Sequence, residues 1–245
     1  MTDGLLLIHA FPLDARMWEP QLGVFADAFP VVAPHLPGFG GTASAGDVMS
    51  MGAAAGRCIE ALDAAGVDHA MVCGLSMGGY VALELWRRAR ERFLGLVLAN
   101  TRAGADSEEG AAGRRALAER LRAEGNGFLV ESPPPLLSEG ASDDLRLRVR
   151  GIIAGQPASA IAAAAIGMAE RPDSTPDLAT VDVPTLVITS DADTLIPAEV
   201  SSPMAAQVPG GQLAVIHGAG HLSNLEAPEA FDELLAVHLE RCLAV

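Results

Sequence analysis

The chain has 245 residues, of which 50% are hydrophobic and 19% charged, a composition typical of a globular protein and unlike that of a disordered one. Its 16 basic and 31 acidic residues give a formal net charge of −15, which disfavours binding to nucleic acids and to anionic membrane surfaces. All the basic residues are arginine, and the absence of lysine excludes pyridoxal-phosphate enzymes, Schiff-base catalysis and Walker-type phosphate loops, each of which needs an amine.

Short apolar runs alternate with longer segments of helical periodicity along the chain. The runs are apolar at successive positions, as in the strands of a parallel sheet that is covered on both faces. They are residues 5–8, 31–33, 70–73, 96–98, 186–188 and 213–216. Helical patterns occupy residues 17–29, 49–65, 77–90, 198–207 and 228–242. This alternation predicts an α/β fold with a mostly parallel sheet of about six strands and helices on both faces.

One long interval, from about residue 101 to residue 181, contains no strand pattern and is too long for a loop of a compact domain. Helical patterns fill it instead, at residues 107–124, 143–154 and 159–170, and Ser107 and Ser159 stand at expected N-cap positions. We therefore predict a core domain made of residues 1–101 and 181–245. Residues 102–180 are expected to form an inserted helical cap, or lid.

The strongest local motif is Gly-Leu-Ser-Met-Gly at residues 74–78, directly after one predicted strand and before a predicted helix. The pattern G-x-S-x-G places its serine on a tight strand-to-helix turn, with the hydroxyl exposed above the sheet. Ser76 is therefore the candidate nucleophile. The backbone N–H of Met77, at the helix start, is a candidate oxyanion donor.

A serine nucleophile needs a general base, and six histidines are present. His221 follows the last predicted strand, at the same edge of the sheet as Ser76, and is the expected base. His217 and His221 have the spacing of a helical zinc pair, but Gly218 and Gly220 disfavour a helix there. We therefore predict no metal site.

The base needs an acid that orients it, and two aspartates follow the fifth strand. Asp193 is favoured because it lies deeper in the loop, before an apolar Leu-Ile-Pro segment, whereas Asp191 is expected to form a turn at the strand end. The resulting order along the chain, serine, acid and histidine, is the order of α/β hydrolases.

Cys58, Cys73 and Cys242 are odd in number and widely spaced, so no disulfide framework is expected. The first residues carry neither a basic segment nor a long apolar one, and no apolar stretch is long enough for a membrane span. The expected location is the cytoplasm. The oligomeric state stays open.

Together these motifs resemble the α/β-hydrolase superfamily, in its serine esterase and enol-lactonase-like branch. The resemblance also includes His-Ala-Phe-Pro at residues 9–12, Pro-Gly-Phe-Gly at residues 37–40, and the segment of residues 220–228 around His221. It implies that the N–H of Phe11 is the second oxyanion donor. The family usually has His-Gly at the first motif, so Ala10 is a departure. Few residues precede the first strand, so the sheet is expected to be reduced to six strands at that edge.

The resemblance implies a cofactor-free serine hydrolase that cleaves small carboxylic esters or lactones through a Ser-His-Asp triad and an acyl-enzyme. Ser76 excludes the dehalogenases and epoxide hydrolases of this fold, which use an aspartate nucleophile. The absence of lysine excludes its hydroxynitrile lyases. A perhydrolase or acyltransferase on the same triad, and a non-catalytic ligand-binding protein of this fold, stay open as alternatives.

The cap is expected to select the substrate, and three side chains are candidate substrate contacts: Trp18, Arg102 and Phe128. Each also has a structural alternative, such as core packing for Trp18 or pairing with Asp106 for Arg102. The acidic composition favours neutral substrates unless charges of the cap reverse that preference.

Overall fold

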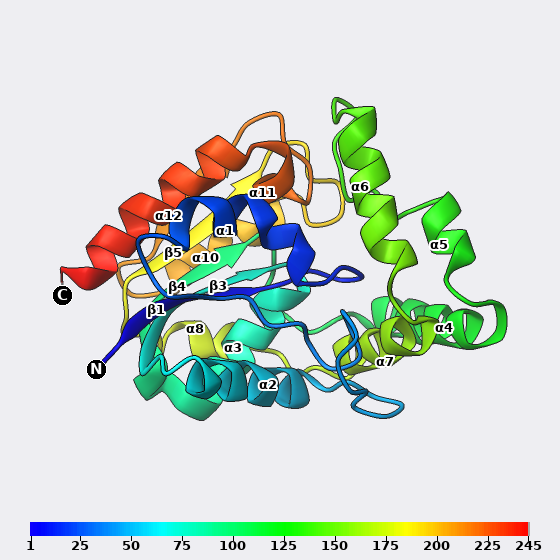
Figure 1. Ribbon diagram of the computed structural model, residues 1–245, viewed down its shortest axis with the longest axis horizontal. Helices are drawn as coiled ribbons and strands as arrows, with labels where there is room; N and C mark the ends of the chain where they lie inside the picture. Colours follow the sequence, from blue (N-terminus) through cyan, green and yellow to red (C-terminus); the bar gives the residue numbers. More distant parts are fainter. Residues whose placement is uncertain (245) are drawn as a thin grey trace.

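The computed structural model describes residues 1–244, which contain one sheet of six parallel strands in the order β2-β1-β3-β4-β5-β6 (Figure 1). The strands are β1 (Asp3–Ile8), β2 (Val31–Val32), β3 (His69–Leu75), β4 (Phe93–Ala99), β5 (Thr185–Ser190) and β6 (Gln212–Ile216). Every neighbouring pair is parallel, so all six carboxyl ends meet at one edge. The prediction of a six-stranded parallel sheet is confirmed.

Helices cover both faces of the sheet. Figure 1 shows α2 (Met51–Ala64) and α3 (Met77–Ala89) on one face, and α1 (Glu19–Phe25) and α12 (Pro228–Leu243) on the other. The two central strands β3 and β4 are almost fully buried between these layers, which explains why their sequences are continuously apolar.

Five helices lie between β4 and β5: α4 (Glu108–Glu124), α5 (Gly127–Glu131), α6 (Asp143–Ala154), α7 (Ala158–Ala169) and α8 (Thr175–Leu178). In Figure 1 the first four gather at one end of the molecule, away from both termini. The long helices α4 and α7 pack against each other. In the described part of the chain no single helix is long and apolar enough to cross a membrane. Helices α6 and α7, whose axes are bent by 92° relative to each other, are long and apolar enough only when they are counted as one segment.

Serine side chains cap two of these helices, because a hydroxyl satisfies an amide that the first turn leaves free. Ser107 Oγ accepts from the N–H of Gly110 at 3.1 Å, as expected from the sequence, and Ser142 Oγ accepts from the N–H of Leu145 at 3.3 Å. Ser159 is not a cap, contrary to expectation. Helix α7 begins at Ala158 because Pro157 precedes it in an extended conformation.

Two predicted helices are shorter than expected. The one expected at residues 17–29 is a 3-10 turn, Ala15–Trp18, followed by α1. The one expected at residues 198–207 is divided into α9 (Ala198–Ser201) and α10 (Pro203–Gln207). Pro203 explains this division, since proline lacks the N–H that would continue the hydrogen-bond ladder.

The prediction that every strand is buried on both faces is wrong for β6. Its Leu213 and Val215 are 46% and 39% exposed. β6 is an edge strand that pairs only with β5, so it lacks the cover that the central strands receive.

Candidate active site

Ser76 lies on a sharp turn between β3 and α3. Its backbone has φ 56° and ψ −115°, a conformation that residues with a side chain rarely adopt. Two contacts hold the turn against this strain: the N–H of Ser76 donates to the carbonyl of Ala99 at 2.9 Å, and Thr101 Oγ1 donates to the carbonyl of Ser76 at 2.7 Å. Such strain is typical of a turn that presents a functional side chain.

Glycines at positions 74 and 78 allow this turn to close. A Cβ at Gly74 would lie 2.2 Å from the carbonyl oxygen of Gly78, and a Cβ at Gly78 would lie 2.1 Å from the carbonyl oxygen of Ile8. Both obstructing atoms belong to the backbone, so they cannot rotate away. The spacing of the motif is therefore explained by close approach of β1, β3 and α3.

His221 and Asp193 form a buried hydrogen-bonded pair at the carboxyl end of the sheet. His221 Nδ1 lies 2.8 Å from Asp193 Oδ2, and the two side chains are 2% and 0% exposed. An ionised carboxylate only accepts hydrogen bonds, so the proton is on Nδ1 and Nε2 is left with a free lone pair. The imidazole therefore has the tautomer that a general base requires.

The Asp193 carboxylate is held by the backbone of its own loop. Oδ1 accepts from the N–H groups of Leu195 at 2.9 Å and Ile196 at 3.0 Å. Burial alone would raise the pKa of Asp193, but the hydrogen bonds from His221, Ile196 and Asn100 outweigh it and lower the pKa below its ordinary value. The group is therefore an anion fixed in position.

Asn100, which was not a candidate site residue, joins the loops that carry these residues. Its Nδ2 donates to Asp193 Oδ2 at 3.0 Å and also to Ser190 Oγ, while its Oδ1 accepts from Ser223 Oγ at 2.7 Å. Ser190 Oγ in turn donates to the carbonyl of Gly220, next to His221, at 2.8 Å. The only signal in the sequence is a polar residue directly after a buried strand, the place where side chains of parallel sheets reach a site.

Asp191 belongs to a different pair. Its carboxylate accepts from His217 Nδ1 at 2.8 Å and from the N–H of Gly218 at 2.7 Å, and the side chains of His217 and Asp191 are 81% and 47% exposed. His217 and His221 thus face two different carboxylates.

A cavity of about 270 Å³ lies at the carboxyl end of the sheet, between the sheet and helices α4 to α7. Ser76, His221, Phe11 and Arg102 all line it, so the structure brings together residues that the sequence had singled out separately. Its full lining is Phe11, Ser76, Tyr80, Arg102, Arg114, Leu117, Leu129, Pro134, Leu136, Met168, Leu195, Ile196 and His221.

Two of the predicted substrate contacts do not line this cavity. Trp18 is fully buried and packs on Phe231, with ring centroids 6.0 Å apart. Phe128, on α5, is half-buried and packs under the guanidinium of Arg120 at 3.8 Å. Both side chains therefore have the structural roles that were their alternatives. Leu129, the neighbour of Phe128, lines the cavity instead.

The backbone N–H groups of Phe11 and Met77 have no hydrogen-bond acceptor among residues 1–244. The loop of Phe11 is held by His9, whose Nδ1 donates to the carbonyl of Ala10 and whose Nε2 accepts from the N–H of Leu36, both at 3.1 Å. Burial lowers the pKa of His9 to about 4, so it is neutral as these contacts require. Ala10 has no positive φ, so the alanine in place of the family's usual glycine causes no backbone strain.

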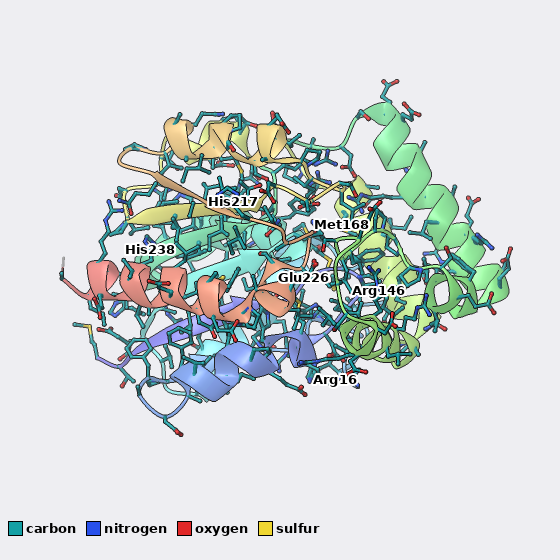
Figure 2. The ribbon with its side chains drawn as sticks, turned by 90° about the horizontal axis from the view of Figure 1, so that it is seen from above. Arg16, Arg146, Met168, His217, Glu226 and His238 are labelled. Atoms are coloured by element: carbon teal, nitrogen blue, oxygen red, sulfur yellow. The ribbon has the colours of Figure 1, made fainter. Side chains whose placement is uncertain are left out.

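Glu226 ties the loop of His221 to the segment before α6. Its carboxylate accepts from the N–H of Gly220 at 2.8 Å and from the N–H of Ser138 at 3.0 and 3.1 Å. The N–H of Leu222 also donates to the carbonyl of Leu136 at 3.0 Å. Figure 2 shows Glu226 and Met168 where the sheet and helices α4 to α7 meet. No local pattern in the sequence indicates this role of Glu226, because its partner Ser138 is 88 residues away.

Known proteins resemble the chain over almost its whole length. Residues 5–234 match the model of the alpha/beta hydrolase family. The chain is 30% identical over 242 residues to 3-oxoadipate enol-lactonase 1 of Acinetobacter baylyi, a match that covers 96% of this chain and 88% of that protein. It is 27% identical to the pimeloyl-[acyl-carrier protein] methyl ester esterase of Yersinia enterocolitica, over 94% of this chain and 91% of that protein.

Among solved structures, a thermophilic esterase from Thermogutta terrifontis, in a malate-bound form, is 39% identical and superposes with a TM-score of 0.94. This match covers 99% of this chain and 92% of that one. The range matched by the family model, residues 5–234, contains the turn of Ser76, both loops of the Asp193–His221 pair and all the helices between β4 and β5.

Proposed function

The chain belongs to the alpha/beta hydrolase family, and from this premise we propose that it hydrolyses small carboxylic esters or lactones through an acyl-enzyme on Ser76. The observation that carries the proposal is the shared cavity. It is bordered both by Ser76 on its strained turn and by His221, whose orientation Asp193 fixes. Relatives named as an enol-lactonase and as esterases support esters and lactones as the substrate class.

In the proposed reaction, Ser76 Oγ attacks the carbonyl carbon while Nε2 of His221 takes the serine proton. Asp193 accepts the hydrogen bond of Nδ1 and stabilises the imidazolium that forms. His221 then gives its proton to the leaving alkoxide, and the acyl group stays on Ser76. Water attacks this acyl-enzyme with His221 again acting as base, which releases the acid and restores the serine.

The N–H groups of Phe11 and Met77 are the proposed donors to the oxyanion. Neither has an acceptor within the described residues, so both are free to bind negative charge that develops in the transition state. Met77 also begins a helix, whose dipole favours an anion at that end. Loss of one such donor typically costs about 3 kcal/mol of transition-state stabilisation.

Residues 102–180 are proposed to act as a cap over the cavity. Seven of the lining residues, from Arg102 to Met168, come from this segment, and the others come from α3 and from the loops that follow the strands. The small volume favours short acyl chains, since pockets for drug-sized ligands are roughly 300–1,000 Å³.

Hydrolysis of p-nitrophenyl esters from acetate to laurate tests the proposal, with Ser76→Ala as the comparison. We expect turnover with the highest kcat/KM at short chains and no turnover above background in the variant. Mass spectrometry after treatment with a fluorophosphonate should locate one adduct, on Ser76. Unchanged turnover in Ser76→Ala, or no hydrolysis of any ester or lactone by the native chain, would contradict the proposal.

A further inference from the structure

Two guanidinium groups on one wall of the cavity, those of Arg102 and Arg114, share a single carboxylate with a third, that of Arg171. Asp106, whose side chain is 1% exposed, accepts from Arg102 and Arg171 on Oδ1 and from Arg114 on Oδ2. Burial would raise the pKa of Asp106, but the hydrogen bonds from Arg171 and Arg114 outweigh it and lower the pKa to about 2. The carboxylate is therefore always ionised, and it compensates only one of three positive charges.

The nearby carboxylate of Glu84 is already paired. Glu84, which borders a small neighbouring cavity together with Arg171, binds Arg87 at 3.1 Å and Arg88 at 2.6 Å. The cavity lining itself contains no acidic residue. This wall is thus locally cationic in a chain whose net charge is −15.

The three arginines are not equivalent. Arg171 is 3% exposed along its side chain, donates to the carbonyls of Met168 at 2.8 Å and Gly104 at 2.9 Å, and stacks 4.0 Å from the ring centroid of Tyr80. Its contacts anchor the structure. Arg102 and Arg114 line the cavity, with side chains 35% and 23% exposed.

In the described part of the chain, Arg102 and Arg114 each have N–H donors without an acceptor. Arg102 Nε is buried without a hydrogen-bond partner in the described residues, where its one acceptor is Asp106. Arg114 uses only its Nε, so its two terminal nitrogens have no acceptor among residues 1–244. Arg102 donates to Asp106 through Nη2 alone, so its Nη1 also has no acceptor among residues 1–244. The terminal nitrogens of both arginines are therefore available to an anion in the cavity, whereas Arg102 Nε is too buried to reach one.

These donors are connected to the turn of Ser76. Arg102 directly follows Thr101, whose hydroxyl holds the carbonyl of Ser76 at 2.7 Å. The cavity wall otherwise consists largely of apolar side chains: Leu117, Leu129, Leu136 and Met168. A ligand that reaches from Ser76 to the arginines would therefore be apolar in its middle and anionic at its far end.

We propose that Arg102 and Arg114 form a carboxylate subsite, so that the substrate is a short ester or lactone carrying a second, ionised carboxyl group. This inference rests on the proposed function, in which Ser76 attacks the ester carbonyl. The planar guanidinium groups match a carboxylate through paired N–H donors. The subsite reverses the preference for neutral substrates that the acidic composition alone predicts.

A matched pair of substrates tests the subsite: the mono-p-nitrophenyl ester of glutaric acid and its neutral methyl diester. They share the leaving group and acyl chain, and they differ in one negative charge and in the methyl group that removes it. We expect the native protein to prefer the acid by about tenfold or more in kcat/KM. Arg102→Gln should reduce kcat/KM for the acid about tenfold more than for the diester, mainly through a higher KM. Arg102→Lys should recover part of the loss.

Arg115→Gln is the matched control, since Arg115 is an exposed neighbour of Arg114 on α4 and does not line the cavity. It makes the same change of charge and should leave the ratio of the two substrates unchanged. Arg102→Gln keeps Arg114 and Arg171 on Asp106, so it should melt at nearly the native temperature. Arg114→Gln is a second, independent variant.

Binding of glutarate to Ser76→Ala, measured by calorimetry, tests the subsite without catalysis. We expect binding that weakens about tenfold or more when Arg102→Gln is added. Equal losses on acid and diester in both arginine variants, together with unchanged glutarate binding, would overturn the subsite. Hydrolysis that persists in Ser76→Ala would overturn the proposed function instead, and the glutarate measurement would still decide the subsite.

Discussion

Asn100 donates a hydrogen bond from Nδ2 to Oδ2 of Asp193 at 3.0 Å, and this is the same carboxylate oxygen that faces His221 at 2.8 Å. Asn100 has φ 43°, a backbone conformation that asparagine tolerates better than most residues. This backbone conformation places a side chain that hydrogen-bonds to Asp193, Ser190 and Ser223. Asn100 acts on the proposed base through Asp193, as a positioning residue.

We expect Asn100→Gly to lower kcat about tenfold with little change in KM, because the carboxylate loses a donor and the Asp193–His221 pair loses its fixed geometry. Glycine removes the side chain and accepts the positive φ, so backbone strain does not confuse the result. Steady-state hydrolysis of p-nitrophenyl acetate measures the effect.

The control for this variant is Asn126→Ala. Asn126 also bonds through its amide, to the carbonyls of Ile153 and Gln156, but it lies in the segment between α4 and α5. It should keep the native kcat. A kcat for Asn100→Gly equal to that of this control would remove the positioning role.

Exchanging each loop aspartate for asparagine separates the two histidine pairs. Asp193→Asn should lower kcat by about a thousandfold or more, since the amide favours the wrong tautomer of His221. Asp191→Asn should leave kcat within about twofold of the native value, because Asp191 binds the exposed His217. A larger loss in Asp191→Asn than in Asp193→Asn would reverse the assignment of the acid.

The sequence predicts well what depends on local pattern. Continuous apolar runs mark the buried strands, and the glycines around Ser76 are recognisable because close backbone contacts forbid any side chain there. The catalytic roles of Ser76, Asp193 and His221 stay predictions, but their position at the carboxyl edge of the sheet follows directly from the strand order.

Contacts between distant segments could not be predicted. Asn100 and Glu226 bond to residues 93 and 88 positions away, and no local pattern encodes such partners. Trp18 and Phe128 were candidate substrate contacts, but a large apolar side chain can equally pack within the structure, and these two pack against Phe231 and Arg120. The exposure of β6 could not be predicted, because an apolar strand has the same sequence pattern at the edge of a sheet as in its centre.

The strained backbone of Ser76 predicts that two inactive variants differ in stability. Ser76→Gly and Ser76→Ala both lack the hydroxyl, but glycine adopts φ 56° without steric cost. We expect Ser76→Gly to be about 1 kcal/mol more stable than Ser76→Ala in urea unfolding. Equal stability of the two inactive variants would show that the turn stores no strain.

Two helical glycines provide a matched test of close packing. Gly78→Ala should lower the free energy of unfolding by about 3 kcal/mol or more, since its Cβ would lie 2.1 Å from the carbonyl oxygen of Ile8. Gly56→Ala in α2, where nothing lies within 4 Å, should raise it by about 0.5–1 kcal/mol. Urea titration at neutral pH measures both. A tolerated alanine at position 78 would contradict the close approach of α3 to β1.

His238 predicts how stability depends on pH. It is buried on α12, away from the cavity, and neither ring nitrogen makes a hydrogen bond of normal geometry within the described residues (Figure 2). Burial, and to a lesser degree the charge of Arg241, lower its pKa to about 4. The backbone groups of Pro184 and Leu96 raise the pKa, but by less. The unfolded chain therefore binds a proton at a higher pH than the native chain does.

The stabilisation from a neutral His238 is complete above the unfolded pKa of about 6.5 and is lost as the pH falls toward 4. When the pH falls from 7 to 4.5, we expect the free energy of unfolding to drop by about 2 kcal/mol less in His238→Leu than in the native chain. Urea titrations at both pH values measure this difference. Parallel pH curves for His238→Leu and the native chain would mean that His238 takes up its proton in the folded protein at no cost, because water or a carbonyl solvates it there.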